Sequence, residues 1–294
     1  MMATRVLLIY GSLFAIGAAL IAAGNRFRHV DAVGRREMWI KYVTYLAITG
    51  SVLGSAFLHP VLFSLLIASV LTVCIREFLA VTRGMLRWGT LLGGLVPLAA
   101  LGGEGSFQFA LSIALLVLLV APLFSPDHGK ALAAAINTAV AIGYIGFLGG
   151  HAILLARREN FFGHVVFFYM LVLVNDAMAL LWGRLLGRRR IWPVLSPNKT
   201  YGGSVGALIW TLITGYFMRF AEPGWGLPMV LGASALIAIF GQLGDVVASA
   251  FKREAEVKDY GDLLPTFGGM LDRFDAFILA APVFYYLVKL ASAS

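Results

Sequence analysis

Long apolar runs separated by short polar stretches make up most of the chain. A helix that crosses a bilayer needs about 20 mainly apolar residues. On this criterion the pattern predicts spanning helices near residues 5–24, 39–58, 60–79, 89–102, 107–124, 131–155, 163–183, 204–220, 228–250 and 273–290. The 89–102 run is short for a complete span. We therefore expect an all-α, polytopic integral membrane protein with about 10 transmembrane helices.

Composition supports this class. Of the 294 residues, 60% are hydrophobic and 13% are charged, whereas soluble domains carry roughly 25% charged residues. The net charge of +8 belongs to a chain too apolar to present a basic face to nucleic acid, so we expect no nucleic-acid partner. A single cysteine, Cys74, lies within an apolar run, which excludes a disulfide scaffold and a cysteine-rich zinc site.

The basic residues predict an orientation. With ten spans, alternate loops face opposite sides, and only Arg5, Arg157, Arg158, Arg219 and Lys289 of the 23 Lys and Arg residues fall in the poorer set. The positive-inside rule assigns the richer set to the cytoplasm. We therefore expect a multi-pass protein of the cytoplasmic (inner) membrane whose two termini face the opposite side.

The two halves of the chain differ in polarity. Residues 1–160 have brief loops and basic edges, which indicates a structural or dimerisation role and leaves a homodimer open. Residues 161–294 carry acids within apolar runs and two longer cytoplasmic loops, 184–203 and 251–272. We expect the catalytic region there.

Two acids lie deep in apolar runs. Asp176 follows Asn175, and Asp245 follows Gly244. A carboxylate at bilayer depth is expensive unless it is paired, solvated or bound to a cation, so each acid is a candidate functional residue. The alternative is an ordinary ion pair in a packed bundle.

The 184–203 loop combines hydroxyl, lysine and glycine residues. Ser196, Lys199 and Thr200 precede Gly202 and Gly203. Exposed backbone N–H groups, a lysine and hydroxyls can surround phosphate oxygens. A basic connector on the cytoplasmic side is the alternative.

The 251–272 loop interleaves cations and acids. Asp272 and Asp275 are three residues apart and share a helix face. Carboxylates can bind a hard divalent cation such as Mg²⁺ while lysine and arginine neutralise phosphates. This combination favours phosphoryl or nucleotidyl transfer, with a solvated, salt-bridged loop as the alternative.

This second loop and its flanks resemble the signature of the phosphatidate cytidylyltransferase (CDP-diacylglycerol synthase) family. The matching residues are Ser249, Lys252, Arg253, Lys258, Asp259, Leu264, Pro265, Gly268, Gly269, Asp272, Arg273 and Asp275. The segments around Asp245 and from Asp176 to Thr200 are similar to two further family blocks. The resemblance covers roughly residues 170–276.

Some family positions differ in this chain. Phe267 replaces the family histidine, Thr266 the glycine before it, Asn198 a lysine and Gly202 a glutamate. Because the acids and most cations are retained, the departures leave metal binding and triphosphate handling in place. They leave open a different lipid phosphate as acceptor.

The resemblance implies transfer of CMP from CTP to phosphatidate, which gives CDP-diacylglycerol and pyrophosphate in phospholipid biosynthesis. It implies that Asp245 and Asp272 hold Mg²⁺, with a second cation left open. The same resemblance implies catalytic cations at Lys252, Arg253, Lys258 and Arg273. It implies substrate-binding roles for Ser196, Lys199, Thr200, Ser249, Asp259, Gly268, Gly269, Asp275 and Asp176.

Three alternatives remain at this stage. A CTP-dependent lipid kinase would use similar phosphate chemistry. A transporter would bind cations at its intramembrane acids, but it would spread them along a pathway, often with repeat symmetry. A catalytically silent relative would account for the departures from the family signature.

Overall fold

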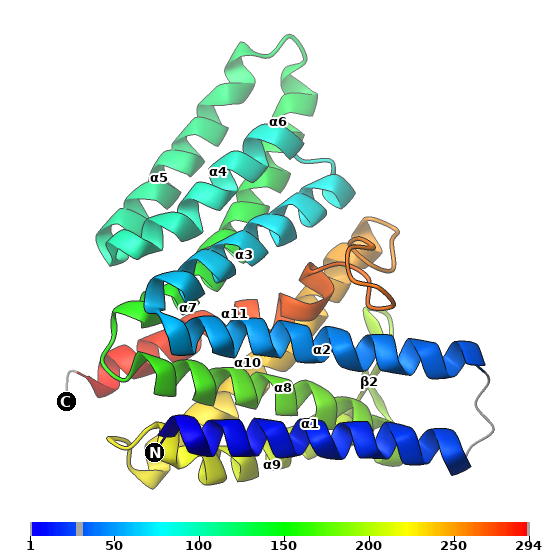
Figure 1. The fold of residues 1–294 in the computed structure, drawn as a ribbon. Helices are drawn as coiled ribbons and strands as arrows, with labels where there is room; N and C mark the ends of the chain where they lie inside the picture. The colour runs from blue at the N-terminus through cyan, green and yellow to red at the C-terminus, as the bar shows by residue number, and fades with distance from the viewer. Residues whose placement is uncertain (1, 28–31, 293–294) are drawn as a thin grey trace.

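The computed structural model describes residues 2–27 and 32–292, and helices dominate it (Figure 1). The long helices are α1 (Met2–Phe27), α2 (Ala32–Leu58), α3 (Pro60–Thr82), α4 (Leu86–Ala99), α5 (Glu104–Val120), α6 (His128–Ala141), α8 (Phe161–Leu186), α9 (Tyr201–Met218), α10 (Leu227–Glu254) and α11 (Leu271–Ala291). Short helices extend several of them, namely η1 (Ala100–Gly102), η2 (Ala121–Phe124), the π-helix η3 (Ile142–Leu148), α7 (Gly149–Leu154), η4 (Leu155–Arg157) and η5 (Arg219–Ala221). Each of the ten predicted spans coincides with one helical segment.

Within the described residues, seven helical segments are long and apolar enough to cross a membrane: Pro60–Thr82, Glu104–Phe124, His128–Arg157, Phe161–Leu186, Tyr201–Ala221, Leu227–Glu254 and Leu271–Ala291. The Leu86–Gly102 segment is shorter, as the sequence predicts. Large apolar side chains such as Phe109, Leu119 and Phe217 are exposed on the outside, where lipid rather than water is their natural surroundings. The all-α, multi-pass membrane class is confirmed.

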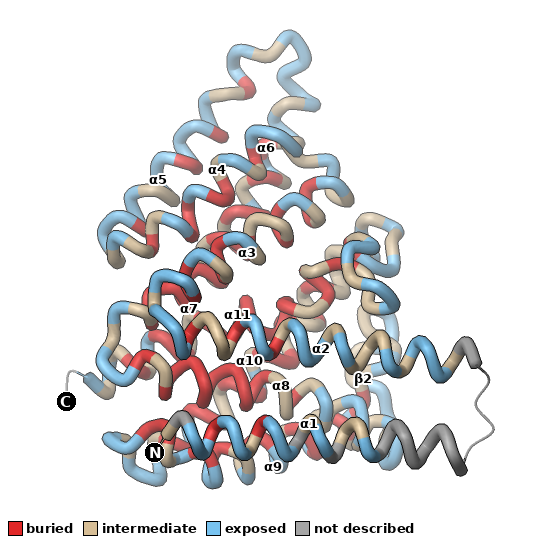
Figure 2. Tube along the Cα trace, in the orientation of Figure 1, coloured by how far each residue is buried: buried red, intermediate tan, exposed pale blue. Residues whose placement is uncertain are grey.

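The helices form two connected parts (Figure 1). Helices α8 to α11 pack together, and α1 and α2 lie alongside them. Helices α3 to α6 form a second part that contacts α11 through α3 and the η3–α7 segment. Burial is densest along α8, α10, α11 and α7, where these parts meet (Figure 2).

Local sequence explains several helix starts. Pro60 opens α3, where a missing N–H costs nothing, and the His59 ring accepts a hydrogen bond from Val61 N–H. Thr200 caps α9 by accepting from Gly203 N–H at 3.1 Å. The backbone of the first turn of α9 is thereby fixed directly after the predicted phosphate-binding motif.

A small β-hairpin was not predicted. Strand β1 (Arg190–Trp192) pairs antiparallel with β2 (Ser196–Thr200), with Arg190 opposite Thr200 and Trp192 opposite Ser196. The hairpin connects α8 to α9. Ser196, Lys199 and Thr200 therefore lie on a strand that is held against its neighbour.

Candidate active site

A cavity of about 850 Å³ is lined by charged and polar side chains at one end and by apolar side chains at the other. Its polar end contains Asp176, Lys199, Asp245, Lys252, Asp272, Arg273 and Asp275. Its apolar end contains side chains of α1, α2, α8 and α11, among them Phe14, Ile48, Met170 and Phe277. A molecule with a charged head and an apolar tail matches this division.

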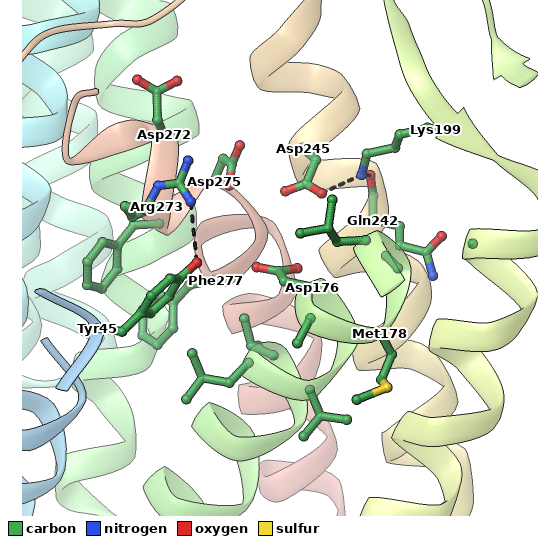
Figure 3. A pocket seen from close by; sticks show the side chains of 18 of the residues that line it. Tyr45, Asp176, Met178, Lys199, Gln242, Asp245, Asp272, Arg273, Asp275 and Phe277 are labelled. Carbon is green, nitrogen blue, oxygen red and sulfur yellow. Dashed lines mark hydrogen bonds and ion pairs between the residues drawn. The ribbon is translucent and has the colours of Figure 1, made fainter. Parts of the chain in front are cut away.

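Lys199 connects the β-hairpin to α10. Its Nζ forms an ion pair with Asp245 Oδ2 and donates a hydrogen bond to the Gln242 carbonyl at 3.0 Å (Figure 3). The Gln242 side chain donates in turn to Asn175 Oδ1 at 3.3 Å. These bonds hold the 184–203 loop over the acidic helices.

Asp272 is the most completely bonded acid of the site. Its Oδ1 accepts from Lys252 Nζ at 2.7 Å, and its Oδ2 accepts from the N–H groups of Tyr260 and Gly269 at 2.9 and 3.0 Å. The Tyr260 hydroxyl donates to the Ala248 carbonyl at 2.8 Å. Burial raises the pKa of the Tyr260 phenol, and the Asp275 and Asp272 carboxyls raise it further, so the hydroxyl stays neutral and can donate.

Three further acids of the cavity lie close to one another. Figure 3 shows the carboxyl groups of Asp176, Asp245 and Asp275 around one space between α8, α10 and α11. Oδ1 of Asp176 is buried with no hydrogen-bond partner, and Asp275 Oδ1 accepts a hydrogen bond from the N–H of the next residue, Ala276, at 2.8 Å. Helices α10 and α11 can approach here because Gly244 has no side chain: a Cβ there would lie 2.4 Å from the Asp275 carbonyl oxygen.

Arg273 lies at the edge of the same cavity between aromatic rings. It donates to the Tyr45 hydroxyl at 3.4 Å (Figure 3). Its guanidinium carbon also lies 4.9 Å from the Phe267 ring centroid. Cation–π attraction of this kind is worth about 0.5–2 kcal/mol. Phe267, where the resembling family has histidine, therefore has a role here as a surface for Arg273.

Sequence reasoning missed Glu77, which lies on α3 in the N-terminal half. Its two carboxylate oxygens accept from the N–H groups of Met270 and Leu271, both at 2.9 Å. Glu77 thus caps α11 directly before Asp272. Its position in an arginine-flanked apolar run is the one signal that could have indicated an acid with a partner.

The other predicted residues divide by location. Ser196, Thr200 and Ser249 line the cavity, and Gly268 and Gly269 adjoin Asp272. The side chains of Arg253, Lys258 and Asp259 are exposed and do not line it. Gly268 has a φ of +84° and would place a Cβ 3.1 Å from Asp272 Oδ2, so glycine is required for the turn around this acid.

The acids partly meet the requirements of a metal site. In the described part of the chain, no group of three or more His, Cys, Asp and Glu side chains is arranged as a ready metal cage. Mg²⁺ seldom uses such a cage, since it takes one or two carboxylates together with substrate phosphates and water. The unpartnered Asp176 oxygen and the adjacent Asp245 and Asp275 fit this mode.

Fold and site together define a polytopic membrane protein with a cavity that combines cations and acids with an apolar wall. The chain belongs to the Cytidylyltransferase family, whose family model matches residues 39–291.

The curated relatives include three that match the same share of this chain. The phosphatidate cytidylyltransferase of Staphylococcus saprophyticus is 40% identical over 150 residues, that of Staphylococcus haemolyticus 38% over 150, and that of Staphylococcus aureus 37% over 153. Each alignment covers 51% of this chain and 57% of the relative. The chain thus matches a little over half the length of these relatives.

Proposed function

We propose that this protein is a phosphatidate cytidylyltransferase that converts CTP and phosphatidate to CDP-diacylglycerol and pyrophosphate. The observation that carries the proposal is the cavity, because its polar end suits two phosphate-bearing groups and its apolar end suits acyl chains. The family membership and the names of the staphylococcal relatives support it.

In the proposed reaction, an oxygen of the lipid phosphate attacks the α-phosphorus of CTP. A new P–O bond forms, the bond between the α-phosphorus and the bridging oxygen breaks, and pyrophosphate leaves with the electron pair. The attacking phosphate is already an anion near neutral pH, so alignment and charge neutralisation are the main requirements. No strong general base is needed.

The cations of the cavity supply this neutralisation. Lys199, Lys252 and Arg273 line its polar end and would bind the phosphates of both substrates. Each lysine is already oriented by a carboxylate partner, Asp245 or Asp272. Arg253 and Lys258, which are exposed, would act outside the cavity by attracting the nucleotide towards it.

Mg²⁺ would be held by Asp245 with Asp275 or Asp176. It would neutralise the triphosphate and stabilise the leaving pyrophosphate. Asp272, the second ligand predicted from the sequence, already accepts three hydrogen bonds, so in this proposal it orients Lys252 and the loop. We further propose that the site faces the cytoplasm from the inner membrane, because the basic loops that surround it follow the positive-inside rule.

Turnover with CTP labelled at the α-phosphate tests the proposal. Purified protein is mixed with labelled CTP, Mg²⁺ and phosphatidate, and the lipid fraction and pyrophosphate are measured. We expect label in the lipid and one pyrophosphate per lipid product. Label in the lipid only when CTP is labelled at the γ-phosphate would instead indicate a lipid kinase, and no product at all would refute phosphatidate as the acceptor.

Variants locate the chemistry. Asp245→Asn should lower turnover by about 100-fold or more, the loss typical of removing a group that stabilises charge in a transition state. Lys199→Ala should raise the CTP concentration needed for half-maximal rate while Mg²⁺ dependence persists. Glu254→Gln is the matched control, since Glu254 is an exposed acid at the end of α10. Wild-type turnover in Asp245→Asn would refute the assignment.

A further inference from the structure

Three hydroxyl side chains lie in the part of the cavity that is otherwise apolar. Tyr10 of α1, Thr49 of α2 and Tyr169 of α8 line the cavity and are 7%, 2% and 4% exposed. The surrounding wall is formed by side chains such as Phe14 and Met170. Polar groups at this depth are unusual because the membrane offers them no water.

The hydroxyls are poorly satisfied by the protein itself. The Tyr10 hydroxyl is buried without any hydrogen-bond partner. Thr49 Oγ1 and the Tyr169 hydroxyl are 3.4 Å apart, a long contact that uses only one of their two protons. Burying a hydroxyl without a partner costs about 1–3 kcal/mol. These groups therefore present free donors to whatever fills the cavity.

The ligand part that reaches them follows from the helix geometry. On α8, Tyr169 precedes Asp176 by seven residues, which is about 10 Å, or two turns, along the axis. A lipid whose phosphate lies among the acids and cations near Asp176 extends past this level with its linkage region and the first part of its chains. In a diacyl glycerolipid the linkage region contains two ester carbonyls, which accept hydrogen bonds and donate none.

We propose that Tyr10, Thr49 and Tyr169 form a binding site for the ester carbonyls of the acceptor lipid. This hydroxyl cluster selects diacyl glycerolipids over lipid phosphates with ether-linked or polyprenyl chains, because those chains offer no carbonyl to the donors. The inference rests on the proposed function for the position of the phosphate. It also gives a role to α1, which precedes the residues matched by the family model.

Lipid binding without CTP tests this site apart from the chemistry. The probes are phosphatidate with two ester-linked chains and its dialkyl ether analogue with the same chain lengths, each titrated into purified protein in the same detergent. Binding is followed by the change in intrinsic fluorescence or in unfolding temperature. We expect the wild type to bind the diester about 10-fold more tightly, the ratio that one or two hydrogen bonds supply.

The variants Tyr10→Phe, Thr49→Val and Tyr169→Phe remove hydroxyls with little change in shape. Each should weaken diester binding several-fold and leave ether binding unchanged. The ratio of the two dissociation constants, ether over diester, should therefore fall towards one. Tyr144→Phe is the matched control, because Tyr144 also has a buried, unpartnered hydroxyl but does not line this cavity. It should retain the full preference.

Equal binding of the two lipids by the wild type would overturn the proposal, as would variants that weaken both lipids alike. CTP turnover measured in parallel separates this result from the proposed function. An ester preference without formation of CDP-lipid would support the hydroxyl cluster and refute the reaction, whereas turnover without an ester preference would do the reverse.

Discussion

Glu77 connects the N-terminal half of the protein to the helix that carries Asp272. Its carboxylate accepts two backbone hydrogen bonds of 2.9 Å from the first turn of α11. Gly261 and Gly269 pack directly against it, since a Cβ at either would lie 3.1 or 2.6 Å from a Glu77 carboxylate oxygen. We predict that replacing Glu77 both destabilises the protein and displaces Asp272 and Arg273 from their places in the site.

The magnitude follows from these two bonds. A hydrogen bond to a charged group contributes about 1.5–3 kcal/mol, and a negative charge at a helix N-terminus adds about 0.3–1 kcal/mol. Some of this is recovered when water reaches the freed N–H groups. Glu77→Ala should therefore lower the free energy of unfolding by about 2–4 kcal/mol. Glu77→Gln keeps one acceptor and should cost about 1 kcal/mol.

Unfolding by denaturant in detergent, followed by circular dichroism, measures the stability, and CDP-lipid formation measures the site. We expect turnover to fall in the order wild type, Glu77→Gln, Glu77→Ala, because Asp272 and Arg273 directly follow the capped residues. Arg76→Gln, an exposed change one residue away, should alter neither. A Glu77→Ala variant within 0.5 kcal/mol of the wild type, with unchanged turnover, would refute the reasoning.

Three further predictions concern single positions. Gly244→Ala should cost about 1–3 kcal/mol in denaturant unfolding and reduce turnover, because the new Cβ would meet the Asp275 carbonyl; unchanged stability would contradict the close approach. Thr266 has a φ of 66°, unfavourable for a β-branched residue, so Thr266→Gly should raise the free energy of unfolding by about 0.5–1 kcal/mol, and a loss would show that the turn tolerates threonine. Burial raises the pKa of the Glu222 carboxyl despite its hydrogen bond to His164, so the folded protein binds that proton more tightly than the unfolded chain. Its contribution to stability must fall as pH rises from about 4.3 through the raised pKa, and unfolding curves of Glu222→Gln should lack this decline; parallel pH profiles would contradict it.

The fold could be predicted from the sequence because one physical constraint dominates it. Each backbone polar group within a bilayer must be bonded inside its own segment, so an apolar run of sufficient length becomes a helix. All ten predicted runs are helical, including the short 89–102 run, which falls in the Leu86–Gly102 segment. The β-hairpin at 190–200 lacks such a signal, since its strands have three and five residues and form outside the apolar runs.

A site residue could be predicted only where its type is unusual for its place in the sequence. Asp176 and Asp245 are visible as acids within apolar runs, and both line the cavity. Glu77 bonds to Met270 and Leu271, 193 and 194 residues further along the chain, and Tyr10 lines the cavity from the first helix, so only packing brings either near the acids. Spacing within a loop also cannot show which of Lys252 and Arg253 turns inward; the structure places Lys252 in the cavity and leaves Arg253 exposed.

The pairing of Lys199 with Asp245 and of Lys252 with Asp272 means that the charge of each of these lysines is already matched by a carboxylate. A phosphate that draws either lysine away uncovers a carboxylate in a place where an uncompensated charge is expensive. A divalent cation bound by Asp245 would release Lys199 in the same way. In the proposed reaction each ligand alone would therefore meet a penalty that the other removes, so that the binding of nucleotide and of Mg²⁺ would be mutually dependent. These two ion pairs would therefore be exchanged for ligand contacts most readily when the metal and the nucleotide bind together.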